Sequence, residues 1–201
     1  MASKAKVRAG ACENECALAP GNIFEVHMDK DSLIALAKQK AAEHGLDPAL
    51  VCAVCEQESG WNPWATRYEP EFMRRYVGPL YTKGGMTATE AYTRSMSWGL
   101  MQIMGQVARE EGYDSLYIAE LSEPAIGLDC GCKHLLRVLQ RHPGDDAAAL
   151  QAWNGGGNAN YASEVMARFP TYVESQSPEL AQAATAASQS PKIIPIDHPA
   201  A

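Results

Sequence analysis

The sequence predicts a mainly α-helical domain. No segment shows a sustained alternation of apolar and polar residues with period two, which is the pattern of a half-buried strand. Several segments instead carry apolar residues at helical spacing between a capping side chain and a glycine. With 46% hydrophobic residues among 201, the chain can bury one ordinary core and needs no second. We therefore expect one helical domain flanked by tails.

The composition divides the chain into three parts. Residues 1–28 mix Gly, Pro, Ala and Cys without a clear period, and they predict an irregular N-terminal arm. The helical patterns fall within residues 29–175, where we expect the folded domain. Residues 176–201 are rich in Ser, Ala, Pro and Gln, which bury little apolar surface. We expect this last part to be a flexible tail.

The first helix is predicted over residues 29–45, which read as an amphipathic segment. Asp31 or Ser32 is placed to cap its start, because a short polar side chain there accepts a hydrogen bond from the unpaired N–H groups of the first turn. Gly45 is expected to end the helix.

The second helix is predicted over residues 47–60, DPALVCAVCEQESG. Asp47 is a suitable N-cap, and Pro48 suits the first helical position, where no N–H donor is needed. Gly60 follows the last apolar residues and is expected to end the helix.

A long excursion follows over residues 61–97, which are aromatic-rich and broken by proline and glycine. We expect short helical pieces at 71–77 and 87–95 inside an insert of about 66–97, and an excursion of this length is usually functional. Ser122, followed by Pro124, is the predicted start of the longest remaining helix. The other helices expected after the insert are 104–112, 122–142, 145–156 and 160–169.

The charge balance excludes a generic nucleic-acid binder. The formal net charge is −7 and the pI is near 5.2, so no basic stripe is available to neutralise phosphates. No apolar run approaches the length of a membrane span, and we expect no stable membrane insertion. The first 21 residues lack the uninterrupted apolar stretch of a secretory signal, so we expect synthesis in the cytoplasm.

The cysteines fall in three close pairs: Cys12/Cys16, Cys52/Cys55 and Cys130/Cys132. Free structural thiols are the favoured interpretation, because cysteine is often buried and no histidine lies at finger-like spacing from these pairs. One or more disulfides, or a metal site, are the alternatives. We expect no cofactor and no metal.

Glu58 is the first candidate for chemistry. It shares a helical face with Leu50 and Val54, near the C-terminal end of an apolar segment. Burial disfavours the charged carboxylate, and the negative end of the helix dipole acts in the same direction, so both raise the pKa. A carboxyl group that keeps its proton near neutral pH suits general acid catalysis. The alternative is an ordinary surface glutamate, capped or ion-paired.

Three motifs stand in order along the chain: CEQESGWNPWA, SWGLMQI and ALQAWNGGGNANY. Together they resemble the soluble lytic transglycosylase family of the lysozyme superfamily, over roughly residues 31–170. The resemblance implies a goose-type lysozyme-like helical domain, here with a long inserted loop region and flexible tails. It also implies that the partner is the glycan strand of peptidoglycan. We expect a monomer.

The resemblance makes Glu58 the catalytic acid/base. It further implies a set of motif neighbours and cleft residues that bind substrate: Ser59, Gly99, Leu100, Met101, Gln102, Trp153 and Asn154. Trp153 stands where the family more usually has tyrosine, so a role that needs a hydroxyl at this position is in doubt. Tyr161, a short step downstream, is the candidate to supply that hydroxyl instead.

Sugar rings present flat apolar faces beside hydroxyl groups, so a groove for them needs aromatic platforms and amides. The chain offers both in the candidate set Trp61, Trp64, Tyr68, Trp98, Trp153, Gln102, Asn154 and Asn158. The alternative for each tryptophan is a place in the core, since large aromatic side chains are mostly buried.

The resemblance implies cleavage with one carboxyl group. Glu58 would protonate the oxygen that leaves C1 of N-acetylmuramic acid, and its carboxylate would then activate the C6 hydroxyl to close a 1,6-anhydro ring. A true muramidase is the first alternative and needs a second carboxylate. Glu69 is preferred for that role over Glu71, Glu90 and Asp129, because it follows the catalytic helix closely. The second alternative is a non-catalytic wall-binding module of a tail or secretion apparatus.

The insert resembles what some phage- and prophage-encoded members of the family carry. Because the first 21 residues also lack the pattern of a secretory signal, we expect a phage or prophage endolysin that reaches the cell wall after release by a holin, or a wall-cutting component that a machine delivers.

Overall fold

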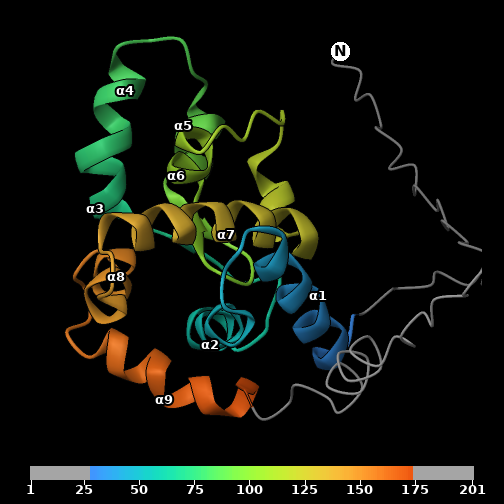
Figure 1. Cartoon of the computed structure of the whole chain (residues 1–201). Helices are drawn as coiled ribbons and strands as arrows, with labels where there is room; N and C mark the ends of the chain where they lie inside the picture. The colour runs from blue at the N-terminus through green and yellow to red at the C-terminus, as the bar shows by residue number, and fades with distance from the viewer. Residues whose placement is uncertain (1–27, 174–201) are drawn as a thin grey trace, which may run out of the picture.

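The computed structural model describes residues 28–173, and it confirms the mainly α-helical prediction. Helix α2 lies at the centre of a helical body and packs against α1 and α9, while α7 crosses above it (Figure 1). The helices of this body are α1 (Lys30–Glu43), α2 (Pro48–Ser59), α7 (Pro124–Arg141), α8 (Asp146–Trp153) and α9 (Tyr161–Val173). The residue that carries the candidate chemistry, Glu58, is thus on the central helix.

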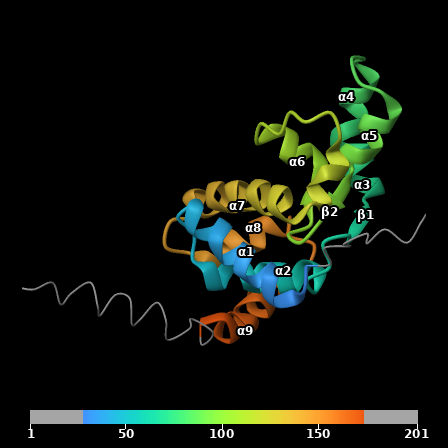
Figure 2. The ribbon, with the colours of Figure 1, turned by 90° about the vertical axis from the view of Figure 1, so that its right-hand side faces the viewer.

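A second group of short helices projects from the other side of α7, away from α9 (Figure 2). We call it the α3–α6 lobe. It consists of α3 (Pro70–Phe72), a π-helical turn (Met73–Val77), α4 (Gly78–Thr82), α5 (Ala88–Arg94) and α6 (Gly105–Glu110), followed by a 3₁₀ turn (Ile118–Ser122). The lobe therefore contains most of the expected insert, and the insert is largely helical.

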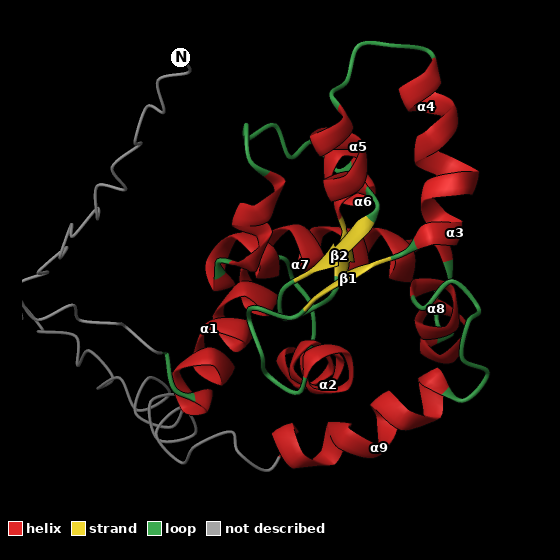
Figure 3. Ribbon diagram, turned by 180° about the vertical axis from the view of Figure 1, so that it is seen from behind, coloured by secondary structure: helices red, strands yellow, loops and turns green. Residues whose placement is uncertain are grey.

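A small antiparallel sheet lies between the lobe and α2 (Figure 3). Its strands are β1 (Thr66–Tyr68), β2 (Met96–Trp98) and β3 (Ile103–Met104), in that order across the sheet. Thr66 pairs with Trp98, and Trp98 also pairs with Ile103. Strands of two or three residues are too short to show a period-two pattern, which is why the sequence did not predict them.

The helix ends agree with the sequence at α2 and differ at α1, α7 and α9. Asp47 caps α2, accepting from the Ala49 N–H at 2.8 Å, as predicted. Helix α1 is capped by Asp29, not by Asp31 or Ser32, because the Asp29 carboxylate accepts the Ser32 N–H at 2.7 Å.

Helix α7 is likewise capped by Glu123 and not by Ser122, which is buried. The Glu123 carboxylate accepts the Ile126 N–H at 2.9 Å, so the helix begins one residue later than the predicted serine cap implies. Helix α9 continues through Pro170, past its predicted end.

The described core has two clusters. One joins α1, α2, α7, α8 and α9, and the smaller one joins the sheet to α6 and the 3₁₀ turn. Met101 reaches the larger cluster from the turn after β2, against Gly131 of α7. A Cβ atom at Gly131 would lie 2.4 Å from the Met101 sulfur, so the absence of a side chain there makes room for this contact.

Four of the six cysteines are described. Cys52, Cys55, Cys130 and Cys132 are free thiols, and all four are buried. Burial raises the pKa of Cys52 to about 12 and that of Cys130 to about 11. These thiols are therefore packing residues. Cys12 and Cys16, the predicted N-terminal arm up to residue 27 and the predicted C-terminal tail lie outside the described residues.

Candidate active site

Glu58 lies in the last turn of α2 and is half-buried. One oxygen, Oε1, accepts a hydrogen bond from Trp153 Nε1 at 2.9 Å and another from the Tyr161 hydroxyl at 2.6 Å. Trp153 ends α8 and Tyr161 begins α9, so three helices meet at one carboxyl group. Within residues 28–173, no hydrogen bond is made to Oε2.

The surroundings raise the pKa of Glu58. Burial is the largest cause, and it outweighs the lowering by the hydrogen bonds from Tyr161 and Trp153 and by the charge of Arg67. Because Oε1 already accepts two hydrogen bonds, the proton of the neutral acid belongs on Oε2. The group is thus arranged as an acid with one oxygen anchored and the other presenting the proton.

Tyr161 is buried, with 3% of its surface exposed. Burial first, and then the neighbouring Glu58 carboxylate, raise the pKa of its hydroxyl far above the ordinary value. Tyr161 therefore stays a neutral hydrogen-bond donor over the working pH range. Trp153 is a donor only, through its indole N–H, so neither neighbour competes with Glu58 for a proton.

Ser59 and Gly99 fix the turn that follows β2 against the end of α2. The Ser59 hydroxyl lies 2.9 Å from the Leu100 carbonyl and 3.1 Å from the Cys55 carbonyl, so its proton serves the backbone. Gly99 has a φ of +69°, and a Cβ atom there would lie 2.5 Å from the Leu121 carbonyl oxygen. Only glycine meets both conditions.

Gln102 closes the same turn with its side chain. Its Nε2 donates to the carbonyls of Ala65 and Gly99, each at 2.8 Å, and its Oε1 accepts from the Ser97 hydroxyl at 2.9 Å. The amide therefore ties β1, β2 and the turn together. The sequence predicts that Gln102 binds substrate, but the structure uses its amide for positioning.

Leu100 and Met101 correct another prediction. Each side chain is only 1% exposed, in the larger core cluster. A side-chain contact with a glycan, as expected from the motif, is wrong for both, because the turn directs these apolar groups inward.

Asn154 directly follows α8 and orders the glycine-rich loop after it. In the orientation that satisfies both atoms of its amide, the oxygen accepts from the N–H groups of Gly157 at 3.2 Å and Asn158 at 2.7 Å. Asn158 in turn donates to Glu164 Oε2 at 3.0 Å, and Gln57 donates to the same oxygen at 2.7 Å. The loop between Trp153 and Tyr161 is thus held to both α2 and α9.

The Transglycosylase SLT domain family matches residues 35–168 of the chain, a range that contains Glu58, Trp153 and Tyr161. The chain belongs to this family. Membership makes it a lysozyme-like protein that acts on peptidoglycan as a lytic transglycosylase. Comparison with solved structures found no match.

The tryptophans of this SLT domain divide by burial. Trp61 and Trp98 are 5% and 7% exposed, and their indole N–H groups donate to the Tyr172 hydroxyl and the Thr93 carbonyl. The prediction that these two are sugar platforms is wrong, because they are core residues. Trp64, at 68% exposed, and Tyr68, at 40%, present open aromatic surface.

The candidate second carboxylates of the SLT domain are all ion-paired. Glu69 lies 2.5 Å from Arg67, whose charge also lowers the pKa of Glu58. The remaining three have partners that do not contact Glu58: Glu71 with Arg74, Glu90 with Arg94 and Arg109, and Asp129 with Lys40 and His44. Glu69 alone among the four thus shares an electrostatic neighbour with the acid.

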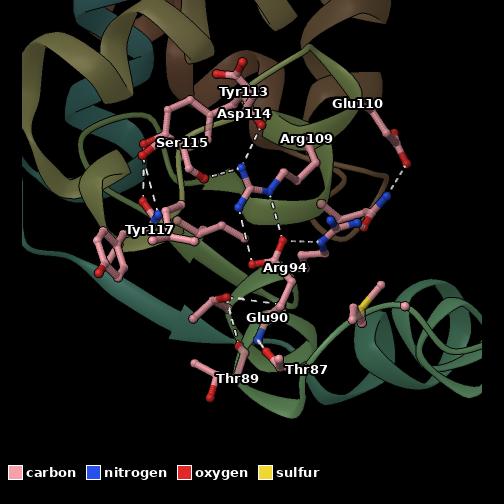
Figure 4. A pocket seen from close by; sticks show the side chains of 17 residues that line it. Thr87, Thr89, Glu90, Arg94, Arg109, Glu110, Tyr113, Asp114, Ser115 and Tyr117 are labelled. Carbon is pink, nitrogen blue, oxygen red and sulfur yellow. Dashed lines mark hydrogen bonds and ion pairs between the residues drawn. The ribbon is translucent and has the colours of Figure 1, made fainter.

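A pocket of about 930 Å³ opens in the α3–α6 lobe of the SLT domain, between α5, α6 and the segment 113–119 (Figure 4). Its floor is a paired network in which Glu90 accepts from Arg94 at 2.7 Å and from Arg109 at 2.9 Å. Arg109 also donates to backbone carbonyls of the 113–119 segment. None of the lining residues bonds to Glu58.

Residues 28–173 contain neither a metal-binding cluster of side chains nor a helix that could span a membrane. No group of three or more His, Cys, Asp or Glu side chains gathers there in a way that would hold a metal ion. In the same residues no helix combines the length and the apolar character needed to cross a membrane.

Sequence reasoning missed three residues around the site. Arg67 acts on Glu58 from β1, Glu164 orders the glycine-rich loop, and the His134 ring packs 5.3 Å from the Trp153 ring. Only Glu164 carries a usable signal, since it stands one helical turn after Tyr161. Arg67 and His134 meet the site through tertiary packing, for which the local sequence has no pattern.

Proposed function

We propose that the chain cleaves the β-1,4 bond between N-acetylmuramic acid and N-acetylglucosamine without water, with formation of 1,6-anhydro-N-acetylmuramic acid. The observation that carries the proposal is the Glu58 carboxyl group. Its Oε1 is held by Trp153 and Tyr161, its Oε2 is left for the glycosidic oxygen, and its pKa is raised by burial.

In the proposed reaction, the proton on Glu58 Oε2 passes to the glycosidic oxygen as its bond to C1 breaks. The 2-acetamido oxygen of the same sugar stabilises the cationic carbon. The Glu58 carboxylate then takes the proton of the C6 hydroxyl, whose oxygen bonds to C1. One carboxyl group serves both proton transfers. In the interval between the two transfers it is charged, and the hydrogen bonds from Tyr161 and Trp153 stabilise this charged form.

Hydrolysis by a second carboxylate is the competing reaction. Glu69 is the candidate, because it alone of the four carboxylates shares Arg67 with Glu58, and its Oε1 lies 2.5 Å from that guanidinium. A carboxylate paired through one oxygen can accept from a water molecule with the other, so the products of the reaction distinguish the two mechanisms.

The test digests purified peptidoglycan in ¹⁸O-water and analyses the fragments by mass spectrometry. Anhydromuramic ends without ¹⁸O, absent with the Glu58→Gln variant and retained with Glu69→Gln, support the proposal. Reducing ends that carry ¹⁸O, lost in both variants, assign a hydrolase with Glu69 as second carboxylate. Binding to peptidoglycan without any product from the native chain assigns a wall-binding module.

We also propose that the enzyme is a phage or prophage endolysin that a holin releases, or a component that a machine delivers. The support is the α3–α6 lobe, which occupies the region where the sequence resembles phage-encoded members. Expression of the chain in bacteria with and without a holin tests this role. Lysis that requires the holin supports it, and lysis without the holin contradicts it.

A further inference from the structure

Trp153 is held on two sides. Its indole N–H donates to Glu58, and its ring packs against His134, which is itself bonded to Glu111. We propose that Glu111 and His134 are positioning residues that hold the Trp153 indole in place for its hydrogen bond to Glu58. The inference rests on the proposed function of Glu58 as the acid.

The contact between His134 and Trp153 limits how the indole can move. The two ring centroids are 5.3 Å apart and the planes are inclined at 43°, which is a close tilted packing of one ring on the other. His134 belongs to α7 and Trp153 ends α8, so the contact joins two helices. Without the imidazole, the half-buried indole would have free space on this side and could turn away from Glu58.

Glu111 fixes the imidazole in turn. Its Oε1 lies 2.9 Å from His134 Nδ1, and its Oε2 lies 2.7 Å from a guanidinium nitrogen of Arg137. Its carbonyl accepts a hydrogen bond from Lys133 Nζ. The Glu111 side chain is only 3% exposed, and the neighbouring Arg137 guanidinium and His134 ring offset part of the cost of burying it, while Oε2 makes no hydrogen bond of good geometry within residues 28–173.

The position of Glu111 extends the chain of contacts into the lobe. Glu111 directly follows the last residue of α6, and α7 lies between α6 and α8 (Figure 1). A continuous path of contacts therefore runs from the lobe through Glu111, His134 and Trp153 to the carboxyl group. Because the Trp153 hydrogen bond lowers the pKa of Glu58, the position of the indole sets part of the acid strength.

The test is a double-mutant cycle between His134→Ala and Trp153→Phe, with kcat/KM measured as a function of pH on peptidoglycan. We expect each single variant to lower kcat/KM by about fivefold, the scale of one hydrogen bond, and to move the alkaline limb of the profile to higher pH. His134→Ala should add nothing in the Trp153→Phe background. Equal effects of His134→Ala in both backgrounds would overturn the proposal.

His44→Ala is the matched control. His44 Nε2 lies 3.0 Å from Asp129, and the His44 side chain is 20% exposed, against 21% for His134. Truncation of either histidine therefore removes a similar contact with a carboxylate, but His44 does not contact Trp153. An unchanged pH profile for His44→Ala is expected, and a shift equal to that of His134→Ala would contradict positioning through Trp153. If His134→Ala does not fold, His134→Leu takes its place in the cycle, because it loses both the bond to Glu111 and the flat ring against Trp153, and the same shift is expected.

Fluorescence separates this inference from the proposed function. The fluorescence emission of Trp153 is obtained by subtracting the spectrum of the Trp153→Phe variant from that of the protein with Trp153, in each background. This emission should change when His134→Ala is introduced and stay constant when His44→Ala is introduced. If Glu58→Gln keeps full activity, the proposed function fails, while this emission still reports on the indole. If Glu58→Gln is inactive but His134→Ala changes neither the emission nor the alkaline limb, the positioning inference alone fails.

Discussion

The hydroxyl of Tyr161 lies 2.6 Å from Oε1 of Glu58, across 103 residues of sequence. The contact follows from the packing of α9 against α2, which places the first residue of one helix beside the last turn of the other. Trp153 donates to the same oxygen. Two donors from neighbouring helices, an indole N–H at the end of α8 and a hydroxyl at the start of α9, thus hold one carboxyl oxygen.

Tyr161→Phe is expected to weaken the enzyme and to change its pH profile. The Tyr161 hydrogen bond lowers the pKa of Glu58, so its loss raises that pKa and moves the alkaline limb of activity to higher pH. We expect kcat/KM to fall by roughly 10- to 100-fold, because a hydrogen bond to a charged group contributes about 1.5 to 3 kcal/mol. Peptidoglycan turnover as a function of pH measures both effects.

Tyr172→Phe is the control for this variant. The Tyr172 hydroxyl donates to Glu56 at 2.8 Å, so it too joins α9 to a glutamate of α2. Its loss should lower the free energy of unfolding and leave the alkaline limb in place. A shift of that limb in Tyr172→Phe equal to the shift in Tyr161→Phe would mean that any loss between these helices disturbs the acid.

Glu58→Gln is expected to make the protein more stable at neutral and alkaline pH while it abolishes turnover. Burial raises the folded-state pKa of Glu58 above its usual value near 4.5, so ionisation costs the folded state. The contribution of the neutral Glu58 side chain to stability is fully present below the pKa of Glu58 in the unfolded chain. It is lost as the pH rises through the pKa of Glu58 in the folded protein. The Tm advantage of the variant should therefore grow from about pH 4.5 upward, and an equal Tm of the two proteins at all pH values would contradict it.

The residues that the sequence identified best are those whose role depends on local order. The caps of α2 and the position of Glu58 in its last turn follow from Asp47, Pro48 and Gly60 within one short segment. A helix whose ends are fixed presents its residues at known angles, so the face on which Glu58 lies follows from this segment alone.

The sequence predicted the wrong surroundings for residues whose side-chain direction is set by tertiary structure. Leu100 and Trp61 belong to motifs of the cleft, yet both point into the core, because the turns after β2 and after α2 reverse the chain there. Period and composition do not reveal the sense of such a turn. Likewise nothing local shows that Trp153 and Tyr161 would meet on a single oxygen.

Gly99→Ala is expected to damage both stability and activity. The left-handed φ of +69° costs an alanine about 1 to 2 kcal/mol. The new Cβ atom would also lie 2.5 Å from the rigid Leu121 carbonyl, so the turn that holds Ser59 must shift. Gly144→Ala is the control, with a φ of +77° and open space around it. Thermal unfolding should show a larger loss at Gly99, and equal losses would mean that the close approach has no effect.

Glu90→Gln is expected to lower the free energy of unfolding at neutral pH by about 2 kcal/mol, the scale of a charged hydrogen bond. Burial raises the pKa of Glu90, but the hydrogen bonds and charges of Arg109 and Arg94 outweigh it and leave the pKa below its usual value. The contribution of the Glu90 carboxylate to stability is present above the pKa of Glu90 in the unfolded chain. It is lost as the pH falls through the pKa of Glu90 in the folded protein.

The difference between native protein and Glu90→Gln should accordingly shrink as the pH falls below about 4.5. Urea unfolding at several pH values measures it. Glu71→Gln is the control, because Glu71 pairs with Arg74 while both side chains are more than two-thirds exposed, at 79% and 74%. An exposed pair contributes little, so the urea midpoint of Glu71→Gln should not move.

Trp64→Ala is expected to weaken glycan binding with little effect on folding. Trp64 is 68% exposed, in the turn that runs from α2 to β1, and it lines a pocket of about 620 Å³ with Pro63 and Pro124. An open indole beside the end of α2 offers a flat apolar face to a sugar ring, so we expect its loss to raise KM by roughly three- to tenfold, the scale of an aromatic contact. Tyr117→Ala, at 63% exposed in the α3–α6 lobe, should leave KM unchanged. Equal rises of KM in the two variants would show that Trp64 acts as general apolar surface and not as a subsite.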